Sequence, residues 1–103
     1  MKSILELTVK KGSKVLSGRS EGEKMRKQLK LDIRDDDKET YEIRVPELFA
    51  ITASYFLACF GISVRKLGKD GFNNKYRFVT SQNSIKKNIA TGIEGSLNID
   101  LPF

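Results

Sequence analysis

Few side chains in this sequence could do chemistry on a substrate. The chain has 103 residues, no histidine and one cysteine, Cys59. Histidine is the usual proton carrier near neutral pH and the commonest metal ligand, and a single cysteine can form neither an intrachain disulfide nor a zinc cluster. Cys59 has Phe56, Leu57 and Phe60 as neighbours, and burial in such surroundings raises the pKa of a thiol. We therefore expect no enzyme activity, no metal site and no cofactor.

Three adjacent carboxylates, Asp35, Asp36 and Asp37, are the other cluster of potential ligands. Residues 35–39 lack the glycine and the terminal glutamate of an EF-hand loop, so they do not predict a calcium site. A run this acidic is typical of a solvated loop between two apolar segments. We expect residues 35–39 to be exposed.

Two hydroxyl side chains, Thr52 and Ser54, come directly before a strongly apolar run. A serine or threonine at the start of a helix accepts hydrogen bonds from its first free amides. A phosphate at the same place would interact favourably with the helix dipole. Helix capping is the simpler interpretation of both residues, and phosphorylation is the alternative.

The net charge of +6 is concentrated in the first third of the chain. Residues 1–34 contain ten Lys or Arg and four Asp or Glu, whereas residues 35–103 contain nine of each kind. The expected first helix carries a basic patch made of Arg19, Lys24, Arg26, Lys27 and Lys30. Such a patch is often only a solvated helix face, but it could also attract an acidic protein or a phosphate backbone.

Hydrophobic periodicity predicts the elements that must position these residues. Alternating apolar residues indicate strands over residues 4–9, 14–17, 41–45, 62–67 and 75–79. The first two should form a hairpin around Gly12, and the last two an antiparallel hairpin. Helical spacing predicts helices from Gly18 to about Leu31, over residues 53–60, and along a stripe of isoleucines at 85, 89 and 93.

These elements define the expected architecture. Ser20 should cap the first helix, Met25, Leu29 and Ile33 should form its buried stripe, and Gly61 should close the central buried helix. A strand, helix and strand between residues 41 and 66 imply an α/β fold with a mixed four- to five-stranded sheet packed against about three helices. We expect one domain over residues 1–103.

No segment is predicted to direct the chain to or through a membrane. Residues 1–7 carry Lys2 and Glu6 and lack an apolar run with a cleavage site. The longest apolar stretch, residues 48–60, is well short of the roughly 20 residues that span a bilayer. We expect a cytoplasmic protein without a membrane partner.

Several short motifs carry a family resemblance. Residues 16–21, Leu-Ser-Gly-Arg-Ser-Glu, place an Arg-Ser pair after a hydrophobic residue and before a helix, and residues 45–61 end Ile-Thr-Ala-Ser-Tyr-Phe-Leu-Ala-Cys-Phe-Gly. With the strand at 75–79 and the isoleucine helix, they resemble the STAS-like family of uncharacterised bacterial and phage proteins. That family is distantly related to the STAS anti-sigma factor antagonists. The resemblance covers about residues 15–95, and the tail 96–103 has no predicted structure.

The resemblance draws attention to residues 52–55. In STAS antagonists the turn before the buried helix carries an Asp-Ser-Ser-Gly-like motif, and a partner kinase that is also an anti-sigma factor phosphorylates one of its serines. Here Thr52 stands in place of the aspartate, Ala53 in place of the usual acceptor and Tyr55 in place of the glycine. Ser54 keeps a serine and, with Thr52, is the candidate phosphorylation site.

The function implied by the resemblance is regulatory protein binding. The partner would be a kinase-like ATPase or an anti-sigma type of protein, contacted by Glu47, Thr52, Ser54 and Tyr55 with the basic helix alongside. The alternative is a small basic nucleic-acid-binding protein, whose phosphate contacts would be Lys24, Arg26, Lys27 and Lys30. Salt separates the two, because nucleic-acid binding weakens steeply with salt and an apolar protein interface weakens much less. The sequence leaves the oligomeric state open.

Overall fold

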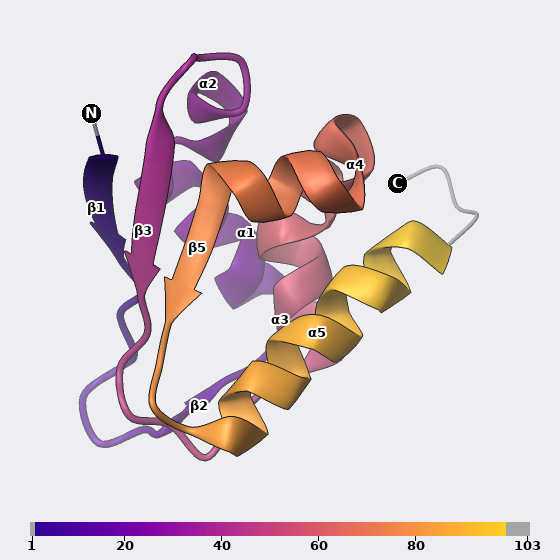
Figure 1. The fold of residues 1–103 in the computed structure, drawn as a ribbon. Coiled ribbons are helices and arrows are strands. Elements are labelled where there is room, and N and C mark those ends of the chain that lie inside the picture. The colour runs from indigo at the N-terminus through magenta and orange to yellow at the C-terminus, as the bar shows by residue number, and fades with distance from the viewer. Residues whose placement is uncertain (1, 99–103) are drawn as a thin grey trace.

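The computed structural model describes residues 2–98, in which helices and strands intersperse along the chain (Figure 1). The elements are β1 (Lys2–Glu6), β2 (Val15–Leu16), α1 (Arg19–Leu29), α2 (Leu31–Arg34), β3 (Thr40–Arg44), β4 (Ala50–Ile51), α3 (Ala53–Phe56), the π-helical turn η1 (Leu57–Gly61), α4 (Ile62–Lys75), β5 (Tyr76–Val79) and α5 (Asn83–Asn98). The predicted α/β class is confirmed.

The strands form two small sheets instead of one. Within residues 2–98, one sheet has the order β1-β3-β5 and the other consists of β2 and β4, and every neighbouring pair is parallel. Parallel neighbours need a crossover connection, and α1 with α2 supplies it between β1 and β3, while α3, η1 and α4 supply it between β3 and β5. The prediction of a mixed four- to five-stranded sheet is therefore wrong in both size and strand direction.

The predicted N-terminal hairpin does not form. A turn is present, since the amide of Ser13 donates to the carbonyl of Lys10 at 2.9 Å, but the chain beyond it pairs with β4 and not with β1. The amide of Thr52 donates to the carbonyl of Leu16 at 2.9 Å. Leu16 and Ile51 are buried in the core at this pairing, and their burial stabilises it.

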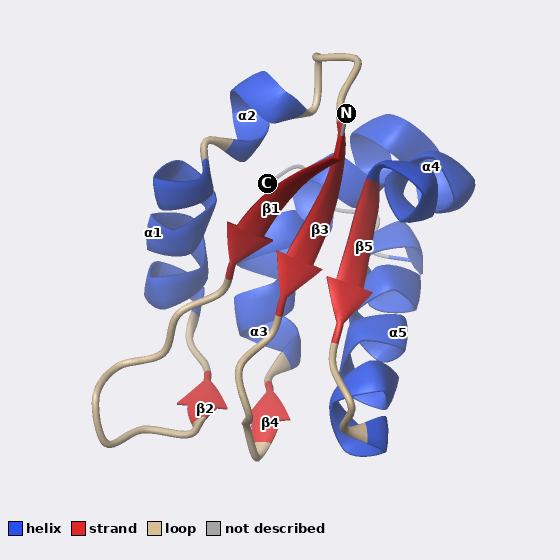
Figure 2. Ribbon diagram, turned by 60° about the vertical axis from the view of Figure 1, so that its left-hand side comes forward, coloured by secondary structure: helices blue, strands red, loops and turns tan. Residues whose placement is uncertain are grey.

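The helices cover one face of the three-stranded sheet and leave the other open (Figure 2). Leu5 and Ile43 point into the core, whereas Ile4 and Val79 are 51% and 47% exposed. This alternation explains why strand periodicity located three strands, with β1 beginning and ending earlier than predicted. The predicted strand at 41–45 is displaced by one residue from β3.

A group of aromatic rings forms the centre of the core. Phe60 packs edge-on against Phe78 with ring centroids 5.1 Å apart, and Phe72 packs against Tyr76 at 5.3 Å. Phe56 and Phe60 are each 1% exposed, which confirms the prediction of a buried central helix at residues 53–60. Tyr76 is buried as well, so the aromatic residues of β5 belong to the core.

The central helix does not end at Gly61, and the strand predicted for residues 62–67 is wrong. Gly61 has helical angles, with φ −56° and ψ −42°, and the chain continues through η1 into α4. A strand would have put Ile62 and Val64 on one face, but Ile62 is 48% exposed and Val64 is fully buried. Helical geometry turns these two side chains apart and lets Val64 reach the core. The glycine that interrupts the helix is Gly68, with φ 77° and ψ 166°.

The first helix is shorter than predicted. α1 starts after Gly18, so Ser20 lies inside the helix instead of capping it. It ends at Leu29 because Lys30 adopts the left-handed conformation, with φ 56°, before α2 begins. Met25 and Leu29 are buried as predicted, but the change of direction at Lys30 leaves Ile33 71% exposed.

The last helix agrees with the isoleucine stripe. Ile85, Ile89 and Ile93 are all buried along α5. The helix continues to Asn98, so the first three residues of the predicted tail are helical, and residues 99–103 lie outside the described part of the chain. None of the helices described is long and apolar enough to span a bilayer.

Candidate functional site

A groove of about 340 Å³ runs between α1 and the helical segment 53–75, which comprises α3, η1 and α4. Leu57, Ala58 and Ile62 form its apolar part. Polar and charged side chains surround them, namely Arg19, Glu23, Arg26, Lys27, Asp32 and Ser54. We call this the α1 groove.

Close helix packing places the two walls of the α1 groove. Gly22 of α1 lies against the helical segment, and a Cβ atom added there would be 2.5 Å from the carbonyl oxygen of Tyr55 and 2.9 Å from the Cβ of Ala58. Only glycine permits this approach. On the other wall Ser54, Ala58 and Ile62 follow one another at four-residue spacing, which puts them on one helix face.

Four of the predicted site residues lie together in the structure, because Arg19, Arg26, Lys27 and Ser54 all line the α1 groove. Ser54 is exposed. Thr52 is the N-cap of α3, where its hydroxyl accepts a hydrogen bond from the amide of Tyr55 at 3.4 Å and lies 3.3 Å from the hydroxyl of Ser54. The capping interpretation is thus confirmed for Thr52, and the Ser54 side chain is left at the surface.

The other predicted site residues lie elsewhere. Tyr55 is only 1% exposed and cannot serve as a surface contact, because it is part of the hydrophobic core. Glu47 is exposed in the loop before β4 and does not line the groove. Lys24 lines a different pocket, together with Tyr55, and Lys30 occupies the junction of α1 and α2.

The residues of the predicted basic patch do not form one basic surface. Arg26 is 6% exposed and is therefore not part of a basic surface. Arg19 and Lys24 are exposed but lie near carboxylates of the same helix, with Arg19 Nε 3.2 Å from Glu23 and Lys24 Nζ 3.8 Å from Glu21. Lys27 is exposed and has no ion pair within residues 2–98. These pairs reduce the surface potential that the sequence predicted.

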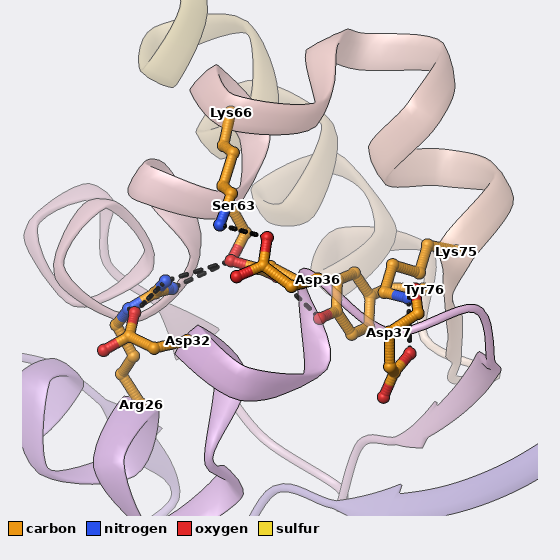
Figure 3. Close-up of polar contacts among 9 residues, drawn as sticks. Arg26, Asp32, Asp36, Asp37, Ser63, Lys66, Lys75 and Tyr76 are labelled. Atoms are coloured by element: carbon orange, nitrogen blue, oxygen red, sulfur yellow. Dashed lines mark hydrogen bonds and ion pairs between the residues drawn. The ribbon is translucent and has the colours of Figure 1, made fainter.

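Arg26 is buried beside α2 and the loop of residues 35–39, which we call the acidic loop, and carboxylates of both bind its guanidinium (Figure 3). Its guanidinium donates to Asp32 at 2.6 Å and to Asp35 at 3.1 Å. It also donates to the hydroxyl of Ser63 at 2.8 Å and to the carbonyl of Cys59, inside η1, at 2.9 Å. A buried guanidinium with this many acceptors is compensated for the loss of its hydration.

Asp35 is the centre of this buried network, so the prediction of a fully solvated loop at residues 35–39 is wrong. One carboxylate oxygen of Asp35 accepts from Ser63 at 2.7 Å and the other from the hydroxyl of Tyr76 at 2.7 Å. Burial, together with this hydrogen bond to Asp35, raises the pKa of Tyr76, so the phenol stays a donor. The network joins α1, the acidic loop, α4 and β5.

Asp37 makes a second connection between the acidic loop and the sheet. Lys75 Nζ lies 2.7 Å from its carboxylate, and the hydroxyl of Tyr41 donates to the same group. Burial raises the pKa of Asp37, but the hydrogen bonds from Lys75 and Tyr41 outweigh it and lower the pKa to about 2. Asp37 is therefore ionised at neutral pH.

The buried members of these polar clusters are paired with one another and join the helices to the sheet. Ser63 is fully buried and already hydrogen-bonded to Asp35 and Arg26, so no substrate reaches it. Burial raises the pKa of Cys59 to about 12, although the charge of Arg26 lowers it slightly, and the direction of this shift is the one that the apolar neighbours of Cys59 predict. Within the described residues no three His, Cys, Asp or Glu side chains are placed to hold a metal ion.

Sequence reasoning missed the apolar wall of the α1 groove and the burial of Arg26. Ile62 was assigned to a strand, although its four-residue spacing from Ser54 and Ala58 was visible in the sequence. Arg26 lies four residues after Gly22 and three before Leu29, on the same face as the buried side of α1. This position on the buried face of α1 indicates, from the sequence alone, that Arg26 is buried.

Comparison with known proteins found no match for this chain. No family model, curated protein or solved structure matches the chain.

Proposed function

We propose that this protein is a non-enzymatic regulatory module that binds another protein through the α1 groove. The observation that carries the proposal is the apolar wall of Leu57, Ala58 and Ile62 enclosed by charged side chains, with Ile62 48% exposed. An apolar centre with a charged rim is typical of surfaces that bind proteins. The resemblance of residues 15–95 to the STAS-like family supports this function and suggests a kinase-like ATPase or an anti-sigma type of partner.

The side chains that line the α1 groove indicate what kind of partner segment would bind there. The partner places one or two apolar side chains against Leu57 and Ile62 and an acidic side chain near Lys27, the cation of the groove that has no ion pair among the described residues. Apolar burial supplies most of the affinity, while the charges at the rim mainly raise the association rate and select the partner.

Ser54 gives this surface a means of control. Its hydroxyl is exposed within the α1 groove, in the same pocket as Arg19. A phosphate there would add nearly two negative charges and would repel an acidic partner. Incubation with the partner kinase should add one phosphate by intact-mass analysis, and Ser54→Ala should abolish the addition. A protein whose mass stays unchanged would overturn the control by phosphorylation.

The groove itself is tested by substitution of an exposed residue. The wild type, Ile62→Asp and a control, Ile33→Asp, are used to capture partners from an extract of the host cell. Ile33 is 71% exposed and does not line the α1 groove, so it matches Ile62 in type. We expect a specific protein to be retained at high salt by the wild type and by Ile33→Asp and to be lost from Ile62→Asp. The same proteins bound to all three, or none bound to any, would contradict the proposal.

Nucleic-acid binding is the second candidate, and the burial of Arg26 removes one of its four predicted phosphate contacts. The remaining three, Lys24, Lys27 and Lys30, are exposed. An electrophoretic shift with DNA or RNA at low salt that disappears steeply as salt rises would favour this candidate over the groove.

A further inference from the structure

The free edge of β1 is a surface that the proposed function does not use. Within residues 2–98, β1 pairs with β3 and with no other strand, so its second edge has no partner strand. In Figure 1, β1 is the leftmost element, and the helices lie to its right. An edge strand of this kind offers unpaired backbone groups to another strand. None of the residues that line the α1 groove belongs to β1.

The hydrogen bonds to β3 show which residues of β1 turn their backbone groups to the free edge. The amide of Leu7, directly after β1, donates to the carbonyl of Arg44 at 3.0 Å, so Leu7 faces β3. Alternate residues of a strand direct their amide and carbonyl groups to the same side, so the backbone groups of Leu5 face β3 as well. The backbone groups of Ile4 and Glu6 therefore point to the free edge.

The side chains of these outward-pointing residues lie on the open face of the sheet. Leu5 and Leu7 are buried in the core, whereas Ile4 and Glu6 are exposed. Ile4 is 51% exposed, and no proline stands in β1 to block the pairing of a further strand. A strand added at this edge would cover Ile4 and satisfy the free backbone groups.

The order of residues along β1 fits a second copy of the same strand in the antiparallel orientation. A two-fold axis at Ile4, the middle residue of β1, pairs the strand over its full length. Residues that point to the shared edge then lie opposite one another, as an antiparallel ladder requires. Ile4 faces Ile4 of the second copy, and Glu6 faces position 2, where the sequence has a lysine. Opposite charges stabilise such a cross-strand pair, whereas a register that placed Glu6 opposite Glu6 would be destabilised.

We propose that two copies of this chain associate through β1 and join their three-stranded sheets into one continuous sheet. Ile4 packs on Ile4 at the two-fold axis, and the opposed residues of the two strands exchange backbone hydrogen bonds. A lysine and a glutamate of different copies pair at each end of the interface. The same strand serves both copies, so the association closes at a dimer. Main-chain hydrogen bonds supply affinity, and the order of the side chains selects a second copy as the partner.

Sedimentation velocity of the full chain tests the dimer directly. One short strand from each copy covers less than the roughly 1,600 Å² of a standard interface, so we expect association in the micromolar range. Measurements from about 5 μM to about 1 mM span that range. The mean mass should rise with concentration toward that of two chains. The mass of one chain at every concentration would overturn the proposal, and so would growth beyond two chains, because a closed dimer leaves no free edge on β1.

A matched pair of substitutions on the open face locates the interface. Ile4→Asp places two carboxylates opposite each other at the axis and should weaken association by roughly tenfold or more. Val79→Asp is the control, because Val79 is 47% exposed on the same face but belongs to β5, at the other side of the sheet. This control should associate as the wild type does. Equal association of the two variants would contradict an interface at β1.

Exchange of the charges tests the antiparallel register and does not alter Ile4. Glu6→Lys has a lysine at both ends of β1, and Lys2→Glu has a glutamate at both ends, so each variant alone opposes like charges and should associate less than the wild type. An equimolar mixture of the two restores opposite charges in both pairs and should recover the dimer. A mixture that associates no better than its components would overturn the antiparallel pairing.

Amide hydrogen exchange gives an independent measurement at the level of single residues. The amides of Ile4 and Glu6 should gain protection as the protein concentration rises, because only the second copy supplies their acceptors. The amide of Leu7, which is bonded to Arg44 within one chain, should be protected to the same extent at every concentration. Protection of Ile4 and Glu6 that does not change with concentration would overturn the role of these backbone groups.

Discussion

The guanidinium of Arg26 and the carboxylate of Asp35 lie 3.1 Å apart, and their side chains are 7% and 0% exposed. Arg26 comes from α1 and Asp35 from the loop after α2, nine residues later, and both reach Ser63 on α4. A charge pair buried this completely is stable only while every member has its partners. The network therefore makes the position of the acidic loop depend on the helices around it.

The two carboxylates that bind Arg26 should contribute very differently to stability. Asp35→Ala leaves Arg26 with a buried charge and Ser63 and Tyr76 without an acceptor, so we expect a loss of about 3–5 kcal/mol in the free energy of unfolding. The side chain of Asp32 is 79% exposed, and Asp32→Ala should cost less than about 1 kcal/mol. Urea unfolding of both variants measures the difference, and equal losses would show that Asp35 is not the centre of the network.

The contact between α5 and α3 should not tolerate a single added methyl group. A Cβ atom at Gly92 would be 2.5 Å from two ring carbons of Phe56, whose ring is buried and cannot move aside. We expect Gly92→Ala to destabilise the fold by about 1–3 kcal/mol.

Gly95, on the same helix, is the matched control for Gly92. An added Cβ there meets nothing within 4 Å. Gly95→Ala should stabilise the fold by roughly 0.5–1 kcal/mol, because alanine favours the helix more than glycine does. Chemical unfolding measures both changes, and a shift of the same sign for the two variants would contradict the packing described.

Asp37 should make the fold sensitive to acid. Its pKa is about 2 in the folded protein against an ordinary value of 3.8, so the folded state binds the proton less tightly than the unfolded state. The resulting contribution to stability is fully present above pH 3.8 and is lost as the pH falls toward 2. Unfolding midpoints measured across this range should fall less steeply for Asp37→Asn than for the wild type. Parallel slopes would mean that Asp37 is not ionised preferentially in the folded protein.

Cys59 should be chemically silent in the native protein. The thiol is fully buried, and its pKa of about 12 leaves almost no thiolate at pH 8. Iodoacetamide should therefore leave native protein unlabelled and should label it completely in denaturant, as measured by intact mass. Rapid labelling without denaturant would show that η1 opens readily.

The features that local periodicity controls could be predicted from the sequence. Alternating residues located the strands that became β1, β3 and β5, and the four-residue spacing of Ile85, Ile89 and Ile93 located α5, because one buried face imposes its period on a strand or helix. The dense apolar run around Phe56, Cys59 and Phe60 was sufficient to predict a buried helix and a raised pKa for the Cys59 thiol. The candidate groove was predicted in part, through Ser54 and the basic residues of α1.

The tertiary structure alone decided which polar residues are buried and which strands pair. Asp35 looked solvated because its partners, Arg26 and Ser63, come from helices that only the fold brings next to it. Residues 62–67 alternate like a strand, yet continuing the helix places Val64 in the core and Ser63 on Asp35, and those contacts outweigh the local preference. Contacts with the core also decide the pairing of β2 with β4, because a strand of two residues is stabilised mainly by the side chains that it buries. Local sequence reports the face that a segment can bury, whereas the free energy of distant contacts selects its partner.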